Sequence, residues 1–202
     1  CLIIAGSGSN NTSHAVELGV AAQDAGADAL LVVSPYYNKA TPNGIVAHYL
    51  SICHCTSIPI IIYNVPGRTG LDIPTSVYKR LSAIPSIAGV KEASTDITKI
   101  AKIRNACGND FPIWSGNDDQ IVPIMALGGK GVISVLSNVL PKETVEMCQK
   151  FFDGDVKGAA EMQFKYFGLI KALFSEVNPI PAKAAMAAMG FCEDYLRLPL
   201  TP

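Results

Sequence analysis

Hydrophobic residues along the chain gather in short runs rich in Val, Ile and Leu, separated by longer stretches of mixed polarity. The runs are almost continuously apolar rather than alternating, which is typical of parallel strands covered on both faces. We therefore predict six strands, at Leu2–Ala5, Ala29–Ser34, Pro59–Asn64, Ile87–Lys91, Phe111–Ser115 and Gly131–Val135.

Apolar residues in the intervening stretches recur at helical spacing. They predict helices from Thr12 onward, at Pro42–Thr56, at Asp96–Ala106 and from Pro141, and two more at Val156–Phe174 and Ile180–Met189. Thr12 and Asp96 have the side-chain oxygen that a helix cap needs, and Pro141 suits a first turn. No strand is predicted between the last two helices.

Alternating strands and helices indicate right-handed βαβ units and a parallel sheet, either an open doubly wound sheet or a (β/α)8 barrel. The stretch "GSGSNN" at residues 6–11 lacks the third glycine of a dinucleotide fingerprint and the lysine of a P-loop, so we interpret it as a turn with an Asn or Thr helix cap. No nucleotide loop therefore anchors an open sheet, and the pattern favours the barrel.

A complete barrel needs about 250 residues, whereas this chain has 202 and six predicted strands. We expect an α/β chain of the (β/α)8 TIM-barrel class with C-terminal helices, seen as a fragment that lacks the first two βα units. Residues 1–152 would form barrel units three to eight, and residues 153–202 a C-terminal helical region.

Composition excludes several classes of partner. With 16 Lys and Arg against 17 Asp and Glu the net charge is -1, so neither nucleic acid nor an anionic membrane is favoured. No apolar run approaches the ~18 residues of a membrane helix. Six scattered cysteines indicate reduced thiols in a cytoplasmic protein. Cys53 and Cys55 flank His54 on a predicted helix, where they would not share a face, so we predict no metal site.

Polar side chains stand where several predicted strands end, which in a barrel is where chemistry occurs. Lys91 in "GVKEAS" closes an apolar run, and strand alternation directs Glu92 to the opposite face, away from Lys91. Apolar neighbours would favour a neutral Lys91 amine, which can form a Schiff base with a carbonyl. Tyr63 could transfer protons, and Arg68 could bind a carboxylate bidentately.

Each of these residues also has an ordinary structural interpretation. Lys91 could snorkel or form an ion pair, Tyr63 could be a buried tyrosine with a satisfied hydroxyl, and Arg68 could be a surface loop charge. At one end of a barrel, however, the three together favour an imine-forming aldolase or lyase.

At these residues the chain resembles a known family. "YNVPGRTG" at Tyr63–Gly70 and "GVKEAS" at residues 89–94 are followed by "GGKGVIS" at Gly128–Ser134 and "NPIPAK" at Asn178–Lys183. This ordered set resembles the dihydrodipicolinate synthase family, pyruvate-dependent class I aldolases related to N-acetylneuraminate lyase. The resemblance runs the full length of the chain and supports the barrel.

The resemblance implies that pyruvate forms an imine with Lys91, becomes an enamine and attacks aspartate 4-semialdehyde, in the first committed step of diaminopimelate and lysine biosynthesis. Tyr63 would relay protons and position the pyruvate carboxylate, while Arg68 would bind the semialdehyde's carboxylate. Gly116 and Ile133 would line the pyruvate pocket. No cofactor is implied beyond the covalent imine.

The resemblance also implies a homo-oligomer, a dimer or tetramer, because Tyr37 would complete the relay in a neighbouring subunit. The relay's threonines would lie in the N-terminal units outside this chain, so we expect the chain by itself to be inactive.

A candidate regulatory site comes from the same resemblance. Lysine-inhibited members bind lysine through residues matching Asn10, His14 and Tyr36, with a glutamate at the position of His14. Because His14 offers no carboxylate to lysine's α-amino group, we predict weak or absent lysine feedback.

Two alternatives stay open at this point. One is another pyruvate-dependent aldolase, such as N-acetylneuraminate lyase or a sugar-acid aldolase, although Arg68 and "KEAS" favour the synthase. The other is a non-catalytic ligand-binding paralogue, against which Lys91, Tyr63 and Arg68 count.

Overall fold

The computed structural model describes residues 1–202, which divide into two compact units. Unit 1 consists of Cys1–Gly116 and Leu127–Lys130, and unit 2 of Asn117–Ala126 and Gly131–Pro202. Each unit is built around its own set of buried apolar side chains. No helix combines the length and the apolarity that crossing a lipid bilayer requires.

Unit 1 contains a parallel five-stranded sheet whose strands follow one another in chain order. The strands are β1 (Ile4–Gly6), β2 (Ala29–Val33), β3 (Ile60–Asn64), β4 (Ile87–Glu92) and β5 (Ile113–Ser115). Each lies within two residues of a predicted run, because continuous stretches of Ile, Val and Leu suit a strand that packs under helices.

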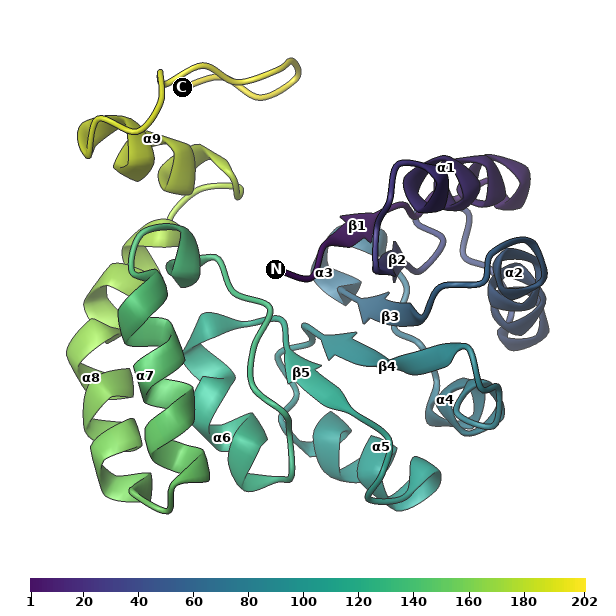
Figure 1. Cartoon of the computed structure of the whole chain (residues 1–202), viewed down its shortest axis with the longest axis horizontal. Helices are drawn as coiled ribbons and strands as arrows, with labels where there is room; N and C mark the ends of the chain where they lie inside the picture. Colours follow the sequence, from purple (N-terminus) through teal and green to yellow (C-terminus); the bar gives the residue numbers. More distant parts are fainter. The chain divides into compact units, whose positions relative to one another are not determined.

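Helices cover one face of this sheet and stand side by side along it (Figure 1). They are α1 (Thr12–Asp24), α2 (Pro42–Cys55), α4 (Thr75–Leu81) and α5 (Thr98–Cys107), with the single turn α3 (Pro66–Thr69) after β3. Side chains that point toward the helices are fully buried, as at Leu30 and Val32, whereas Leu31 and Val33 on the other face are half-buried. The other face is therefore the accessible one within this chain.

Helix α1 begins at Thr12 as predicted, and the structure distinguishes the two candidate capping residues. Asn11, rather than Thr12, caps the helix, since its side chain accepts a hydrogen bond from the His14 backbone N–H at 3.2 Å. Thr12 instead shares a 2.9 Å hydrogen bond with Nδ1 of the buried His48 on α2. The sequence left Asn or Thr open as the cap because both residues have a capping oxygen, and only the tertiary contact distinguishes them.

The sixth predicted strand, Gly131–Val135, is not a strand of the sheet. Only Val132 forms an isolated bridge. The backbone N–H groups of Val135 and Leu136 donate to Oδ2 of Asp118, at 3.0 and 2.8 Å, instead of to a neighbouring strand. The carboxylate thus turns the chain into a short 3-10 helix and ends the extended segment.

Unit 2 is helical. Its elements are the 3-10 turns η1 (Asp118–Gln120) and η2 (Leu136–Asn138) and the helices α6 (Ile121–Ala126), α7 (Pro141–Phe152), α8 (Val156–Leu173) and α9 (Ile180–Ala188). Helices α7 and α8 lie side by side (Figure 1). Met125 and Met147 belong to one buried cluster, and Leu136 and Ile170 to another. Pro141 begins α7 as predicted, and α8 and α9 match their predicted ranges within one residue.

Arg104, near the end of α5, forms hydrogen bonds that hold the segment Leu127–Lys130 against the rest of unit 1. Its guanidinium donates to the carbonyl oxygens of Gly108, Asn109 and Phe111 and, at 2.7 Å, to that of Gly128. The Lys130 backbone N–H donates in turn to the carbonyl of Ile113 on β5. This segment therefore extends the hydrogen bonding at the end of the sheet.

Candidate active site

Two side chains meet on the accessible face where β3 and β4 end. Tyr63 and Lys91 occupy paired positions of the parallel ladder. The Lys91 Nζ lies 4.3 Å from the centroid of the Tyr63 ring, close enough for the ring face to interact with an ammonium. Both residues are half-buried, and the same row continues to Val33 on β2 and Trp114 on β5. The structure therefore brings together the amine and the phenol predicted from the sequence.

Tyr63 has a perturbed phenol. Burial raises its pKa above the ordinary value of 10.0, and the positive charge of Arg68 opposes that change without cancelling it. The hydroxyl is therefore protonated at neutral pH and can donate a hydrogen bond or a proton. The Arg68 charge is close enough to act on the pKa of the phenol, although Arg68 itself is exposed to solvent.

Arg68 is positioned by the turn that follows β3. Pro66 begins the turn α3, and Gly70 ends it in the left-handed conformation at φ 69°. A proline at the first helical position and a glycine after the last fix where such a short helix starts and stops. As a result, Arg68 lies on the helical turn that comes directly after β3, the strand that carries Tyr63 and pairs with the strand of Lys91.

Tyr37 lies on the loop after β2, and the loop is attached to the same turn. Its backbone N–H donates to the carbonyl of Thr69 at 3.0 Å. Tyr37 has φ 72°, a value that is uncommon for a bulky residue, and its side chain is 87% exposed. The structure thus places Tyr37 beside the Arg68 turn but does not bring its ring against Tyr63 or Lys91 within this chain.

Gly116 follows β5 at the end of unit 1, and only glycine fits there. Its N–H donates to the carbonyl of Glu92 at 2.7 Å, and a Cβ at this position would stand 2.5 Å from the Cβ of Ala93. Ile133 belongs to unit 2, where it is half-buried and follows the Val132 bridge. The contribution of Gly116 and Ile133 to a pyruvate pocket stays a prediction.

The candidate regulatory residues lie in unit 1, with Asn10 on the loop after β1, His14 on α1 and Tyr36 on the loop after β2. Asn38 Nδ2 donates to the carbonyl of Asn10, and the Asn38 backbone N–H donates to the carbonyl of Tyr36. Asn38 therefore connects two of the three residues. His14 Nδ1 lies 3.2 Å from Glu17 Oε2 at the surface of α1. Lysine binding at these residues stays a prediction.

Sequence reasoning missed the row of polar side chains behind the Tyr63–Lys91 pair. Glu92 lies on the face opposite Lys91, as strand alternation predicts, but it is 1% exposed and hydrogen-bonded to Asn64, which is fully buried. The signal was present in the sequence. An Asn and a Glu follow the two predicted site residues at the ends of apolar runs, where polar side chains need partners.

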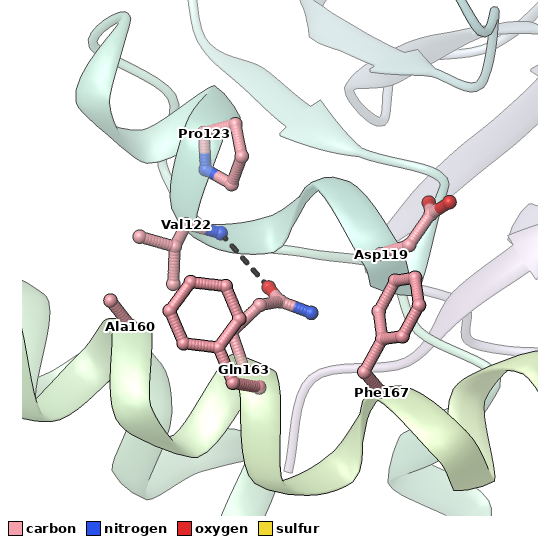
Figure 2. A pocket seen from close by; sticks show the side chains of 7 residues that line it. Asp119, Val122, Pro123, Ala160, Gln163 and Phe167 are labelled. Atoms are coloured by element: carbon pink, nitrogen blue, oxygen red, sulfur yellow. Dashed lines mark hydrogen bonds between the residues drawn. The ribbon is translucent and has the colours of Figure 1, made fainter.

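A separate apolar cavity of about 330 Å³ lies in unit 2, between α6 and α8 (Figure 2). Gln163 crosses it, accepting from the Val122 N–H at 3.3 Å and donating to the carbonyl of Asp118 at 2.8 Å. Pro123 and Phe167 are among its lining residues, and none of the predicted site residues is. No group of three or more His, Cys, Asp or Glu side chains could hold a metal ion, and all six cysteines are free.

Comparisons with known proteins agree over the whole chain. The model of the dihydrodipicolinate synthetase family matches residues 1–202. A 4-hydroxy-tetrahydrodipicolinate synthase from Thermoanaerobacter sp. (strain X514) is 54% identical over 199 residues, which cover 98% of this chain and 67% of the relative.

Solved structures match as closely. A chloride-inhibited dihydrodipicolinate synthase from Acinetobacter baumannii, complexed with pyruvate, has a TM-score of 0.96 and 43% identity, covering 100% of this chain and 69% of that one. A monomeric dihydrodipicolinate synthase variant has a TM-score of 0.97 and 45% identity, covering 100% and 68%. The predicted barrel class and the prediction of an enzyme of the lyase type are thereby confirmed. The chain belongs to the dihydrodipicolinate synthetase family.

Proposed function

We propose that this protein condenses pyruvate with aspartate 4-semialdehyde through an imine on Lys91, as a 4-hydroxy-tetrahydrodipicolinate synthase of lysine biosynthesis. One observation carries the proposal: the Lys91 Nζ lies 4.3 Å from the Tyr63 ring centroid, on the accessible face where two neighbouring strands end. Family membership and the pyruvate-bound relative from Acinetobacter baumannii support pyruvate as the carbonyl substrate.

The first step is imine formation. The neutral Lys91 amine attacks C2 of pyruvate, the carbon–oxygen bond breaks, and the oxygen leaves as water with two protons from the amine. Burial keeps the Tyr63 phenol protonated at neutral pH, so the phenol can give a proton to the departing oxygen and recover one from the amine. The imine nitrogen then takes a proton from solvent, and the resulting iminium acidifies the C3 methyl group. Transfer of a C3 proton to water gives the enamine, which attacks the semialdehyde's aldehyde carbon.

Arg68 supplies the charge for the second substrate. Arg68 is exposed at the turn after β3, and its positive charge acts to lower the pKa of Tyr63. A planar guanidinium matches a carboxylate bidentately, so Arg68 would hold the carboxylate of the semialdehyde while its aldehyde faces the enamine. Gly116, after β5, would line the pyruvate pocket, and the chemistry needs no metal or organic cofactor because the amine itself activates the substrate.

The proposal includes a homo-oligomer in the cytoplasm. The exposed Tyr37 ring lies on a loop attached to the Arg68 turn and would act in a neighbouring subunit. A monomeric variant shares this fold, so the assembly has to be measured, by light scattering coupled to size-exclusion chromatography.

Borohydride trapping tests the proposal. The protein, expressed from its complete gene, is treated with pyruvate and borohydride, and its peptides are analysed by mass spectrometry. We expect reductive labelling of Lys91 with pyruvate and none in the Lys91→Arg variant. A matched control is Lys79→Arg on α4, which should label as the parent does. Labelling at another lysine, or turnover of N-acetylmannosamine in place of aspartate 4-semialdehyde, would contradict the proposal.

A further inference from the structure

A buried polar pair stands directly behind the Tyr63–Lys91 pair. Asn64 and Glu92 follow those residues in β3 and β4 and are themselves paired in the ladder. They are 0% and 1% exposed, and Asn64 Nδ2 donates to both Glu92 carboxylate oxygens, at 2.9 and 3.0 Å. Because neighbouring strand residues point to opposite faces, this contact lies on the helix-covered side of the sheet.

The Glu92 carboxylate accepts further hydrogen bonds from α4 and from the backbone that follows β4. The Tyr78 hydroxyl on α4 donates to Oε2 at 3.0 Å, and the Ser94 backbone N–H donates to Oε1 at 2.8 Å. Burial raises the pKa of Glu92, and the hydrogen bonds from Ser94, Asn64 and Tyr78 oppose that rise. A set made only of donors fits a carboxylate, which accepts and does not donate.

Asn64 is fixed from the other side as well. Its Oδ1 accepts from the Ile73 N–H at 3.2 Å, and its Nδ2 also donates to Asp72 Oδ1 at 2.9 Å. Asp72 in turn pairs at 2.8 Å with Lys99 Nζ, whose residue is 6% exposed. The Lys99 ammonium supplies the positive charge that a cluster with two carboxylates needs in a buried site.

The β3–β4 ladder is irregular just before the site, where Ile60 pairs with Ile87 but Ile61 pairs with Gly89. A slip of one residue moves every side chain of a strand to the other face. The Asn64–Glu92 contact forms only in the register that also sets Tyr63 opposite Lys91.

We propose that Asn64 and Glu92 are positioning residues, whose mutual hydrogen bonds on the covered face hold Tyr63 and Lys91 opposite one another for imine formation. This inference rests on the proposed function, because it assigns the pair a role in that reaction. Neither residue touches substrate; both act through the strand positions of their neighbours.

Glu92→Gln tests the inference with little change in volume. The amide keeps one acceptor oxygen but places an N–H₂ group against donors, which weakens the link between β3 and β4. Tyr78→Phe is the matched control, since it removes one hydrogen bond to the same carboxylate without touching that link. The measured quantities are the rate constant for formation of the borohydride-trappable imine on Lys91, the KM for pyruvate and the Tm. The hydrogen-exchange rates of the backbone N–H groups of Asn64 and Glu92 are measured as well.

We expect Glu92→Gln to slow imine formation by about 10- to 100-fold, as misplacement of reacting groups does, with a KM for pyruvate within about 3-fold of the parent's. Its Asn64 and Glu92 amides should exchange faster than in the parent. Tyr78→Phe should lower the Tm while keeping the imine rate within about 3-fold and the exchange unchanged. If both variants slow the imine by the same factor, or neither does, the inference is wrong.

Two further outcomes are distinguishable. If the parent forms no imine on Lys91, the proposed function fails, and unchanged amide exchange in Glu92→Gln would separately overturn the positioning role. If Glu92→Gln does not fold, Asp72→Asn takes its place, because Asp72 is half-exposed and removing its charge loosens Asn64. An imine rate and amide exchange in Asp72→Asn equal to the parent's would overturn the inference.

Discussion

At the scale of single residues, the proposed site consists of one amine, one phenol and one guanidinium, which come from β4, β3 and the turn after β3. Lys91 and Tyr63 are held by neighbouring strands, whereas Arg68 is held by a single helical turn between Pro66 and Gly70. The sheet therefore fixes Tyr63 and Lys91, the proposed reacting pair, whereas a shorter element carries Arg68, the residue proposed to bind the second substrate.

This division of roles predicts the behaviour of Arg68→Ala. The variant should lower kcat/KM for aspartate 4-semialdehyde by about 100-fold, since a charge-assisted bidentate contact is lost. Imine formation with pyruvate should change far less. Steady-state kinetics and borohydride trapping measure the two quantities, and Arg80→Ala on α4, which loses a bond to Asn43 instead, serves as control. Equal losses in both steps would contradict the assigned role.

The sequence predicted these residues because chemistry collects where parallel strands end, and Lys91 and Tyr63 each close an apolar run. It could not predict what holds them. Tyr78 and Lys99 look like ordinary residues of α4 and α5, and only the folded chain brings them to Glu92 and Asp72. These two contacts join residues far apart in the chain, so no local pattern encodes them, although Asn64 and Glu92 themselves stand out in the sequence as polar residues at the ends of apolar runs.

At the scale of elements, the strands and the long helices were predictable and the short helices were not. The five strands follow from continuous apolar runs, and the helices longer than eight residues follow from hydrophobic periodicity. The elements α3, α4, α6, η1 and η2 span three to seven residues each, too few for a period to emerge. The Gly131–Val135 run has strand composition, but hydrogen bonds to Asp118 turn its end into a 3-10 helix.

The pairing between β3 and β4 is irregular next to Gly89, a position that requires glycine. Gly89 has φ 147°, and a Cβ there would lie 2.5 Å from the Pro112 carbonyl oxygen and 2.8 Å from the Trp114 ring. Gly89→Ala should therefore lower the free energy of unfolding by at least about 1–3 kcal/mol. Gly168→Ala, in open space on α8, should raise it by about 0.5–1 kcal/mol. Urea unfolding measures both, and equal effects would refute the explanation.

The contact between α1 and α2 predicts a dependence of stability on pH. Burial lowers the pKa of His48 below its ordinary value of 6.5, so the folded state binds the proton less tightly than the unfolded state. Its contribution to stability is therefore present above pH 6.5 and lost as the pH falls through and below that value.

Urea unfolding between pH 7.5 and 5.5 should show this loss in the parent and a shallower loss in His48→Asn, which keeps a polar partner for Thr12 but cannot titrate. His54→Asn, an exposed change on the same helix, should keep the parental slope. A slope that is identical in all three proteins would contradict the assignment to His48.

At the scale of the whole molecule, regulation is predicted to differ from that of lysine-inhibited relatives. The parent should keep full activity at millimolar lysine, because His14, paired with Glu17, offers no carboxylate to the ligand. His14→Glu should increase sensitivity to lysine, whereas Glu17→Gln should leave it unchanged. Initial rates with and without lysine measure the inhibition of each protein, and strong inhibition of the parent would overturn the prediction.

The connection made by Arg104 has a consequence for dissecting this protein. Unit 1 is discontinuous: its last segment, Leu127–Lys130, arrives only after the chain has passed through α6. A truncation after Gly116 would leave the Arg104 guanidinium without the Gly128 carbonyl, and β5 without the Lys130 N–H. During synthesis, therefore, β5 gains this hydrogen bond only after residue 130 has emerged from the ribosome, although the strand itself ends at Ser115.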